Sequence, residues 1–181
     1  MMSRLTTPAE STLSDATLEQ LEPFKLKGKI APVYLQMGNS DAALSAYLSM
    51  ETALKSSTLG SAEIETIKLL VSQITGCDYC LSIHHMKATV AGLDDEQKLK
   101  IRRRETLDDP RLDAIVKTVA RFFEQPGALY DSEMQRLAAA GFSDAEMVDL
   151  VLAVSTIAFT NFFNHINKTQ SPLPAAPLLT D

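Results

Sequence analysis

Apolar residues recur at intervals of three and four through most of the chain, and no segment shows the period-two alternation of a β-strand. Helix start signals precede several of these segments. Asp94 with Gln97 and Ser143 with Glu146 have the spacing of a capping box, in which the two side chains satisfy backbone groups of the first helical turn. The sequence therefore predicts an all-α protein, a single-domain bundle of about six to eight helices.

Glycine and proline mark the ends of the expected helices. Gly76, Gly92 and Gly141 each close one, whereas Pro23 and Pro32 interrupt the region before residue 40. The expected helices are a short one at about 17–21 and longer ones over 41–54, 61–75, 77–91, 110–125, 131–140 and 143–166, with a short charged helix beginning at 94.

The chain of 181 residues is long enough for one domain with short tails. We expect the domain at 15–168. Residues 1–14 are polar and without periodicity and are expected to form a flexible tail. Residues 169–181 contain three prolines and are expected to form a second tail.

Composition narrows the classes of function. Hydrophobic residues make up 45% of the chain and charged residues 22%, and the net charge is −6, which argues against nucleic acid as a partner. The N-terminal residues lack the apolar centre of a signal peptide, and the longest apolar segment, 148–163, is interrupted by polar residues such as Asp149 and Asn161. We expect a cytoplasmic protein that does not associate with membranes.

The two cysteines of the chain, Cys77 and Cys80, are three residues apart. In a reducing compartment this pattern favours catalysis or metal binding over a structural disulfide. On a helix, Cys77, Cys80 and His84 share one narrow stripe. A helix N-terminus lowers thiol pKa values, a neighbouring imidazole accepts or stabilises a proton, and CxxC spacing lets one cysteine resolve what the other forms.

Glu65 belongs to the preceding helix, twelve residues before Cys77. If the two helices pack antiparallel around Gly76, its carboxylate reaches the stripe of Cys77, Cys80 and His84. Taken alone, Glu65 is most simply a solvated helix residue and His84 a core histidine.

The segment ETIKLLVSQITGCDYCLSIHH carries a more specific pattern: Glu65, eleven residues, Cys77, two residues, Cys80, three residues, His84. It resembles the core motif of the alkylhydroperoxidase D family, within the carboxymuconolactone decarboxylase-like superfamily. The resemblance covers about residues 40–166. It implies an all-helical, obligately oligomeric enzyme that reduces alkyl hydroperoxides without a bound cofactor.

Carried over by position, the resemblance implies that Cys80 attacks the peroxide, Cys77 resolves, His84 assists Cys80 and Glu65 completes a proton relay. It also implies a homo-oligomer that receives electrons from a dithiol protein of lipoyl-, thioredoxin- or glutaredoxin-like type. One departure is Tyr79, because the best-known members have histidine just before the second cysteine.

Other functions stay open. A disulfide oxidoreductase without peroxidase activity, a carboxymuconolactone decarboxylase-like lyase and a non-catalytic metal-binding or partner-binding module all fit an all-helical chain. We favour redox chemistry over a metal, because zinc usually takes four ligands and one helical stripe supplies them poorly. Tyr79 and Asn161 are further candidates for lining the site.

Overall fold

The computed structural model describes residues 3–25 and 27–179, and in this part of the chain it contains nine α-helices, two 3-10 helices and no β-strand. The predicted all-α fold is confirmed. The elements are η1 (Glu10–Thr12), α1 (Asp15–Leu21), η2 (Glu22–Phe24), α2 (Pro32–Met37), α3 (Asp41–Lys55), α4 (Ser61–Thr75), α5 (Asp78–Val90), α6 (Asp95–Arg103), α7 (Pro110–Glu124), α8 (Asp131–Ala139) and α9 (Asp144–Asn167).

The helix ends lie at the signals that the sequence contains. The side chains of Asp94 and Ser143 cap α6 and α9, each with the reciprocal bond of a capping box. The structure adds α2, which the sequence analysis does not anticipate. Pro32 occupies its first turn, where the missing N–H has no helical partner to lose, so this proline begins a helix instead of interrupting one.

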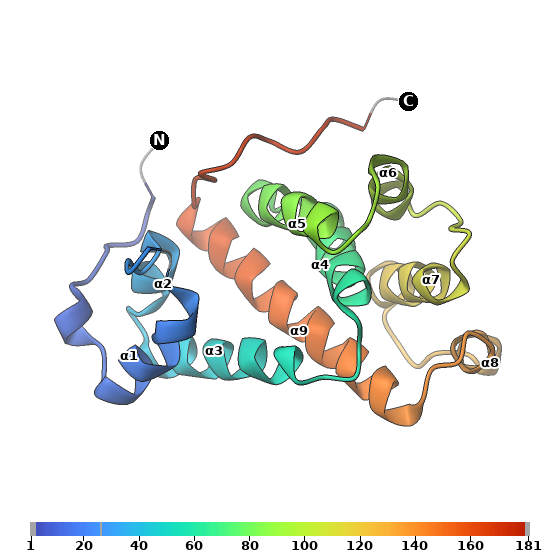
Figure 1. Ribbon diagram of the computed structural model, residues 1–181, viewed down its shortest axis with the longest axis horizontal. Coiled ribbons are helices and arrows are strands. Elements are labelled where there is room, and N and C mark those ends of the chain that lie inside the picture. Colours follow the sequence, from blue (N-terminus) through green and yellow to red (C-terminus); the bar gives the residue numbers. More distant parts are fainter. Residues whose placement is uncertain (1–2, 26, 180–181) are drawn as a thin grey trace.

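Helix α9 lies between two groups of helices (Figure 1). On one side its Phe163 packs against a core formed by α1, α2 and α3, with Leu21, Leu44 and Leu48 at the centre. On the other side Ile157 and neighbouring residues of α9 belong to the larger core of α4 to α8. Helix α9 thereby joins the two cores into one bundle.

The outward face of α9 is apolar and exposed. Its large exposed apolar side chains are Val148, Val151, Phe159, Phe162 and Ile166, with the exposed Ser155 among them. Among the described residues, α9 is also the one helix whose length and apolar composition would suffice to cross a membrane, a test that a core helix of a soluble protein passes equally. Because α9 packs against α3, α4 and α5, we describe it as the central helix of the bundle.

The connection between α4 and α5 is short and sharply turned. Gly76 ends α4 with φ +70°, in the left-handed region that disfavours residues with a Cβ atom. Cys77 follows at once as the N-cap of α5. As a result, α5 folds back along α4 and the cysteines lie at the closed end of this helix pair.

Candidate active site

The two thiols lie at the start of α5, one turn apart and buried in the protein. Cys77 occupies the N-cap, where its Sγ accepts a hydrogen bond from the backbone N–H of Cys80 at 3.3 Å. The two sulfur atoms are 2.7 Å apart and each side chain is only 3% exposed. Both cysteines are free thiols in this structure. Such proximity lets the pair pass between dithiol and disulfide with little movement of the backbone.

His84 and Glu65 meet across the α4–α5 pair. His84 Nδ1 lies 2.7 Å from Glu65 Oε2, and both side chains are largely buried. This contact joins residues nineteen positions apart in the sequence. The fold therefore brings together the four residues, Glu65, Cys77, Cys80 and His84, that the sequence pattern selects.

A cavity of about 440 Å³ opens beside Cys80 and His84. We call it the cysteine cavity. Cys80 lines it and Cys77 does not, so a small molecule that enters meets Cys80 first. The residues that line it are Pro23, Phe24, Lys25, Ala31, Val33, Tyr34, Met37, Tyr47, Glu51, Lys55, Tyr79, Cys80, Ile83, His84, Met86, Lys87, Thr160 and Asn164.

The candidate Asn161 and a second asparagine of α9, Asn164, have different positions. Asn161 is fully buried away from the cysteine cavity, and its Nδ2 donates to Thr75 Oγ1 at 2.8 Å. Asn164, one turn later, lines the cavity and donates from Nδ2 to Cys80 Sγ at 3.2 Å. The Oδ1 atom of Asn164 is buried without a hydrogen-bond partner among the described residues. It is an acceptor available to a ligand beside Cys80.

A buried ion pair lies beside the same cavity. The ammonium group of Lys68 contacts both carboxylate oxygens of Glu51, at 2.8 and 2.9 Å, and the hydroxyl of Tyr47 donates to Glu51 Oε1 at 2.9 Å. Lys68 is 3% exposed although it is charged. A charge at this depth requires a partner, and Glu51 supplies it.

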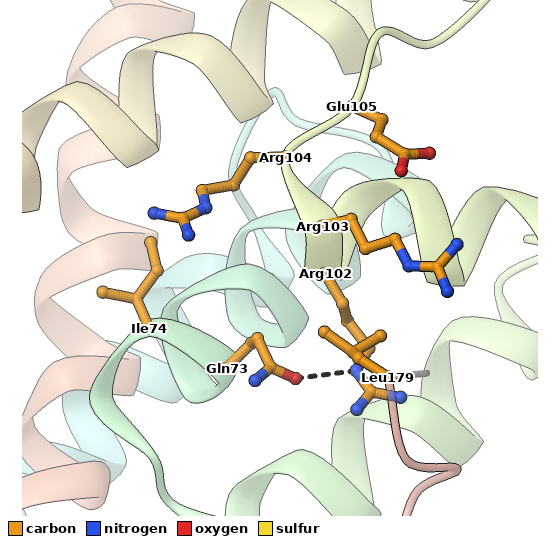
Figure 2. A pocket seen from close by; sticks show the side chains of 7 residues that line it. All are labelled: Gln73, Ile74, Arg102, Arg103, Arg104, Glu105 and Leu179. Carbon is orange, nitrogen blue, oxygen red and sulfur yellow. Dashed lines mark hydrogen bonds between the residues drawn. The ribbon is translucent and has the colours of Figure 1, made fainter. Parts of the chain in front are cut away.

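A larger cavity, about 590 Å³, lies elsewhere, between α4, α6 and the C-terminal segment (Figure 2). We call it the arginine cavity, and it is lined by Gln73, Ile74, Arg102, Arg103, Arg104, Glu105 and Leu179. Arg102 donates to Gln73 Oε1 at 2.8 Å and to the carbonyl oxygen of Pro177 at 2.7 Å. None of these lining residues is a cysteine or histidine, so thiol chemistry is confined to the cysteine cavity.

The described residues contain no group of three or more His, Cys, Asp and Glu side chains arranged to hold a metal ion. His85 and His165, the other two histidines, are not among the residues that line the cysteine cavity, and His165 Nε2 instead contacts the carbonyl oxygen of Thr75 at 2.9 Å.

Comparisons with known proteins agree with this architecture. Residues 41–108, which include α3 to α6 and all four motif residues, match the model of the carboxymuconolactone decarboxylase family. A comparison with curated proteins gives no match. A solved structure from Agrobacterium tumefaciens, a protein of unknown function proposed to be the antioxidant defence protein AhpD, is 25% identical. It has a TM-score of 0.67, with 76% of this chain and 96% of that chain covered.

Residues 41–108 of the chain are thus similar to the carboxymuconolactone decarboxylase family, and the fold resembles that of a protein proposed to be AhpD.

Two further solved structures share the fold at lower identity. An alkylhydroperoxidase AhpD core protein from Ralstonia eutropha, described as an uncharacterised peroxidase-related protein, has a TM-score of 0.79 at 16% identity, with 94% of this chain and 93% of that chain covered. The debrominase Bmp8, solved with 2,3,4-tribromopyrrole, has a TM-score of 0.72 at 19% identity, with 93% and 92% covered. The alkylhydroperoxidase D-like fold thus occurs in proteins described by different reactions.

In this candidate site the two thiols have unequal acidity. The hydrogen bond from Cys80 lowers the pKa of Cys77, and the backbone N–H of Cys80 adds to the effect. The same contact with Cys77, together with burial, raises the pKa of Cys80. Acidity therefore places the first negative charge on Cys77, whereas the cavity exposes Cys80. The sulfur atoms are in hydrogen-bonding contact, so a proton can pass between them, and access decides which one meets a substrate.

The histidine and carboxylate have distinct charge states. Burial lowers the pKa of His84 despite the raising influence of Glu65. Burial alone would raise the pKa of Glu65, but its hydrogen bond to His84 and the nearby charges outweigh it and lower that pKa. Because burial dominates at His84, we assign a neutral imidazole whose Nδ1–H donates to an ionised carboxylate. Its other nitrogen, Nε2, is then a base.

Tyr79 lies just before Cys80, at the position where the best-known members of the alkylhydroperoxidase D family, which the motif resembles, have histidine. It lines the cysteine cavity, and burial, together with the charges of the two cysteines, raises its pKa to about 12. Tyr79 is therefore a neutral phenol at physiological pH, which can donate a hydrogen bond but cannot act as a base.

Sequence reasoning missed Glu51, Lys68 and Tyr47 as parts of the site, and it did not place Asn164 beside Cys80. One signal was available, because Lys68 lies on the same helical face as Ile64, Ile67 and Val71. A lysine within an apolar stripe needs a buried partner. The identity of that partner depends on how α3 packs against α4, and the spacing of apolar residues in the sequence does not reveal this packing.

Proposed function

We propose that this protein is a cysteine-based enzyme that reduces organic hydroperoxides through a dithiol and disulfide cycle of Cys80 and Cys77. The observation that carries the proposal is the position of Cys80. Its thiol lines a cavity, lies 2.7 Å from the sulfur of Cys77, and shares that cavity with His84, whose Nδ1 contacts Glu65.

In the first step the sulfur of Cys80 attacks the terminal oxygen of a hydroperoxide ROOH. As an S–O bond forms and the O–O bond breaks, the Cys80 proton passes to the Cys77 thiolate or to His84 Nε2. The departing alkoxide takes a proton and leaves as the alcohol ROH. The sulfur is oxidised to a sulfenic acid and the peroxide is reduced.

In the second step the sulfur of Cys77 attacks the sulfur of the Cys80 sulfenic acid. A disulfide forms and water leaves, so that ROOH and two thiols give ROH, water and one disulfide. An external dithiol protein, of lipoyl-, thioredoxin- or glutaredoxin-like type, then restores both thiols by thiol–disulfide exchange.

Other contacts at Cys80 support peroxide binding. The unpaired Oδ1 of Asn164 can accept the peroxide O–H, and Tyr79 can donate to the second oxygen. A cytoplasmic, reducing setting fits this cycle, because the cycle begins and ends with two reduced thiols.

We also infer that the chain self-associates. The apolar outer face of α9 has five exposed large side chains in one helical stripe, which is the composition of an interaction surface. Phe162→Glu should reduce the molecular mass measured by light scattering, whereas Val90→Glu on α5 should not.

The test of the peroxidase is a thiol titration before and after one equivalent of cumene hydroperoxide, with mass spectrometry of the peptide that contains both cysteines. We expect rapid loss of two thiols and a mass decrease of two hydrogens. Thiols that persist, or that react no faster than free cysteine, contradict the proposal. A persistent dithiol that still exchanges with an added disulfide would indicate an oxidoreductase without peroxidase activity.

A further inference from the structure

The cysteine cavity is much larger than hydrogen peroxide requires. Its volume of about 440 Å³ lies within the roughly 300–1,000 Å³ of pockets that hold drug-sized ligands. One part of its wall is apolar and aromatic, with Phe24, Val33, Tyr34 and Met37 contributed by η2 and α2. These walls suit the carbon skeleton of an organic hydroperoxide.

The wall of the cavity also contains positively charged side chains. Lys55 is in the last turn of α3 and Lys87 is in the last turn of α5, and both line the cavity. Neither forms an ion pair with any described residue. Lys55 instead lies 4.2 Å from the ring centre of Phe24. Lys25 also lines the cavity but is paired with Glu22.

Negative charge inside the cavity does not balance these lysines. Glu51 is the one carboxylate among the lining residues, and it is already bound to Lys68 on both of its oxygens. The cavity therefore has an excess of positive charge although the whole chain has a net charge of −6. Overall composition does not account for this charge.

The distance between the reactive thiol and a charged group of the cavity indicates how long a bound ligand would be. Cys80, His84 and Lys87 follow one another on the same face of α5, and the seven helical steps from Cys80 to Lys87 span about 10 Å. A ligand with its peroxide at Cys80 and its far end toward Lys87 extends over most of that distance.

We propose that the preferred substrate is an organic hydroperoxide with an apolar body whose far end bears an anionic group, such as a carboxylate. This inference rests on the proposed peroxidase function and specifies its substrate class. The peroxide lies against Cys80 and Asn164, the body packs on the aromatic wall, and Lys55 and Lys87 bind the anion.

The test compares cumene hydroperoxide with its para-carboxylate analogue. The second-order rate constant for thiol loss is measured for each and divided by the rate constant of the same peroxide with free cysteine, which removes differences in intrinsic reactivity. We expect the normalised constant to be about tenfold higher for the carboxylate at low ionic strength, and the difference to shrink as salt screens the lysines.

The variant for this test is Lys55→Gln combined with Lys87→Gln. The readout is the ratio of the two normalised constants, because the charge of Lys87 also acts on Glu65 and His84. The ratio should fall toward one. Lys100→Gln, which removes a lysine paired with Glu96 on α6, should leave the ratio unchanged.

A ratio near one in the unaltered protein, or a high ratio that survives in the double variant, overturns the substrate class and leaves the peroxidase in place. If neither peroxide oxidises the thiols, the proposed function fails and this inference fails with it.

Discussion

The cysteine cavity and the arginine cavity both have basic side chains in their walls, but they differ in what those side chains serve. In the arginine cavity, Arg102 is bound to Gln73 and Pro177 and Arg104 is paired with Glu124. In the cysteine cavity the charged groups surround a thiol, a buried imidazole and an unpaired amide oxygen. The larger volume alone would have selected the wrong cavity, since reactivity depends on the groups that converge and not on the space between them.

The largest expected effect on peroxide consumption comes from removing the thiol that faces the cysteine cavity, whereas a substitution in the arginine cavity should have none. Cys80→Ser should lower peroxide consumption by at least about a thousandfold, because the serine hydroxyl is not ionised at neutral pH. Arg104→Gln, in the arginine cavity, should leave consumption unchanged. Consumption by Cys80→Ser at an appreciable rate would contradict the assignment of the nucleophile.

The same experiment on the other cysteine separates the two roles. Cys77→Ser should retain the first oxidation and accumulate a sulfenic acid on Cys80, detected as a gain of one oxygen or as an adduct with a sulfenic acid trap. The Cys80→Ser variant tests the opposite assignment. If Cys77 in that variant forms the adduct as fast as Cys80 does in Cys77→Ser, then Cys77 can also attack the peroxide, and its lower pKa matters more than the exposure of Cys80 to the cavity.

Loss of the carboxylate partner of His84 should have the next largest effect. Glu65→Gln keeps the size of the side chain but removes the charge that accepts the Nδ1–H, so the rate of thiol oxidation should fall about a hundredfold. Glu63→Gln on the same helix, where the side chain pairs with Arg111, is the matched control and should retain the rate.

The buried ion pair near the cysteine cavity and the exposed pair near the arginine cavity should contribute unequally to the free energy of unfolding. Lys68→Met leaves Glu51 without its partner and should lower the free energy of unfolding by about 2 kcal/mol, below the range for fully buried pairs because Glu51 is partly exposed. Arg104→Gln should barely change it, since that side chain is 48% exposed. Denaturant unfolding of both variants is the measurement, and equal losses would contradict the comparison.

The smallest expected effect concerns pH. The folded-state pKa of His84 is lowered from 6.5 by burial, so the unfolded chain binds more protons than the folded one as pH falls below that value. The contribution of neutral His84 is therefore complete above about pH 6.5 and is lost as pH falls through the lowered folded-state pKa. Tm should decline as pH falls below about 6.5, and His84→Gln should flatten the decline.

The sequence by itself determined most of the helices and selected the candidate reactive residues. Capping residues and glycines act over a few positions, so the ends of α6 and α9 were predictable, and the spacing of Cys77, Cys80 and His84 fixes them on one face of any helix that contains them. The proximity of Glu65 was a conditional prediction, because it requires α5 to fold back at Gly76.

Only the tertiary structure decided which side chains complete the site. Asn164 approaches Cys80 from a helix more than eighty residues away, and Glu51 reaches Lys68 from α3. These contacts depend on the crossing of α3, α5 and α9, which periodicity leaves undetermined because an apolar stripe states that a face is buried and not which helix covers it. The arrangement of Lys55 and Lys87 around one cavity arises in the same way, since each is an ordinary helix-terminal lysine until the helices pack.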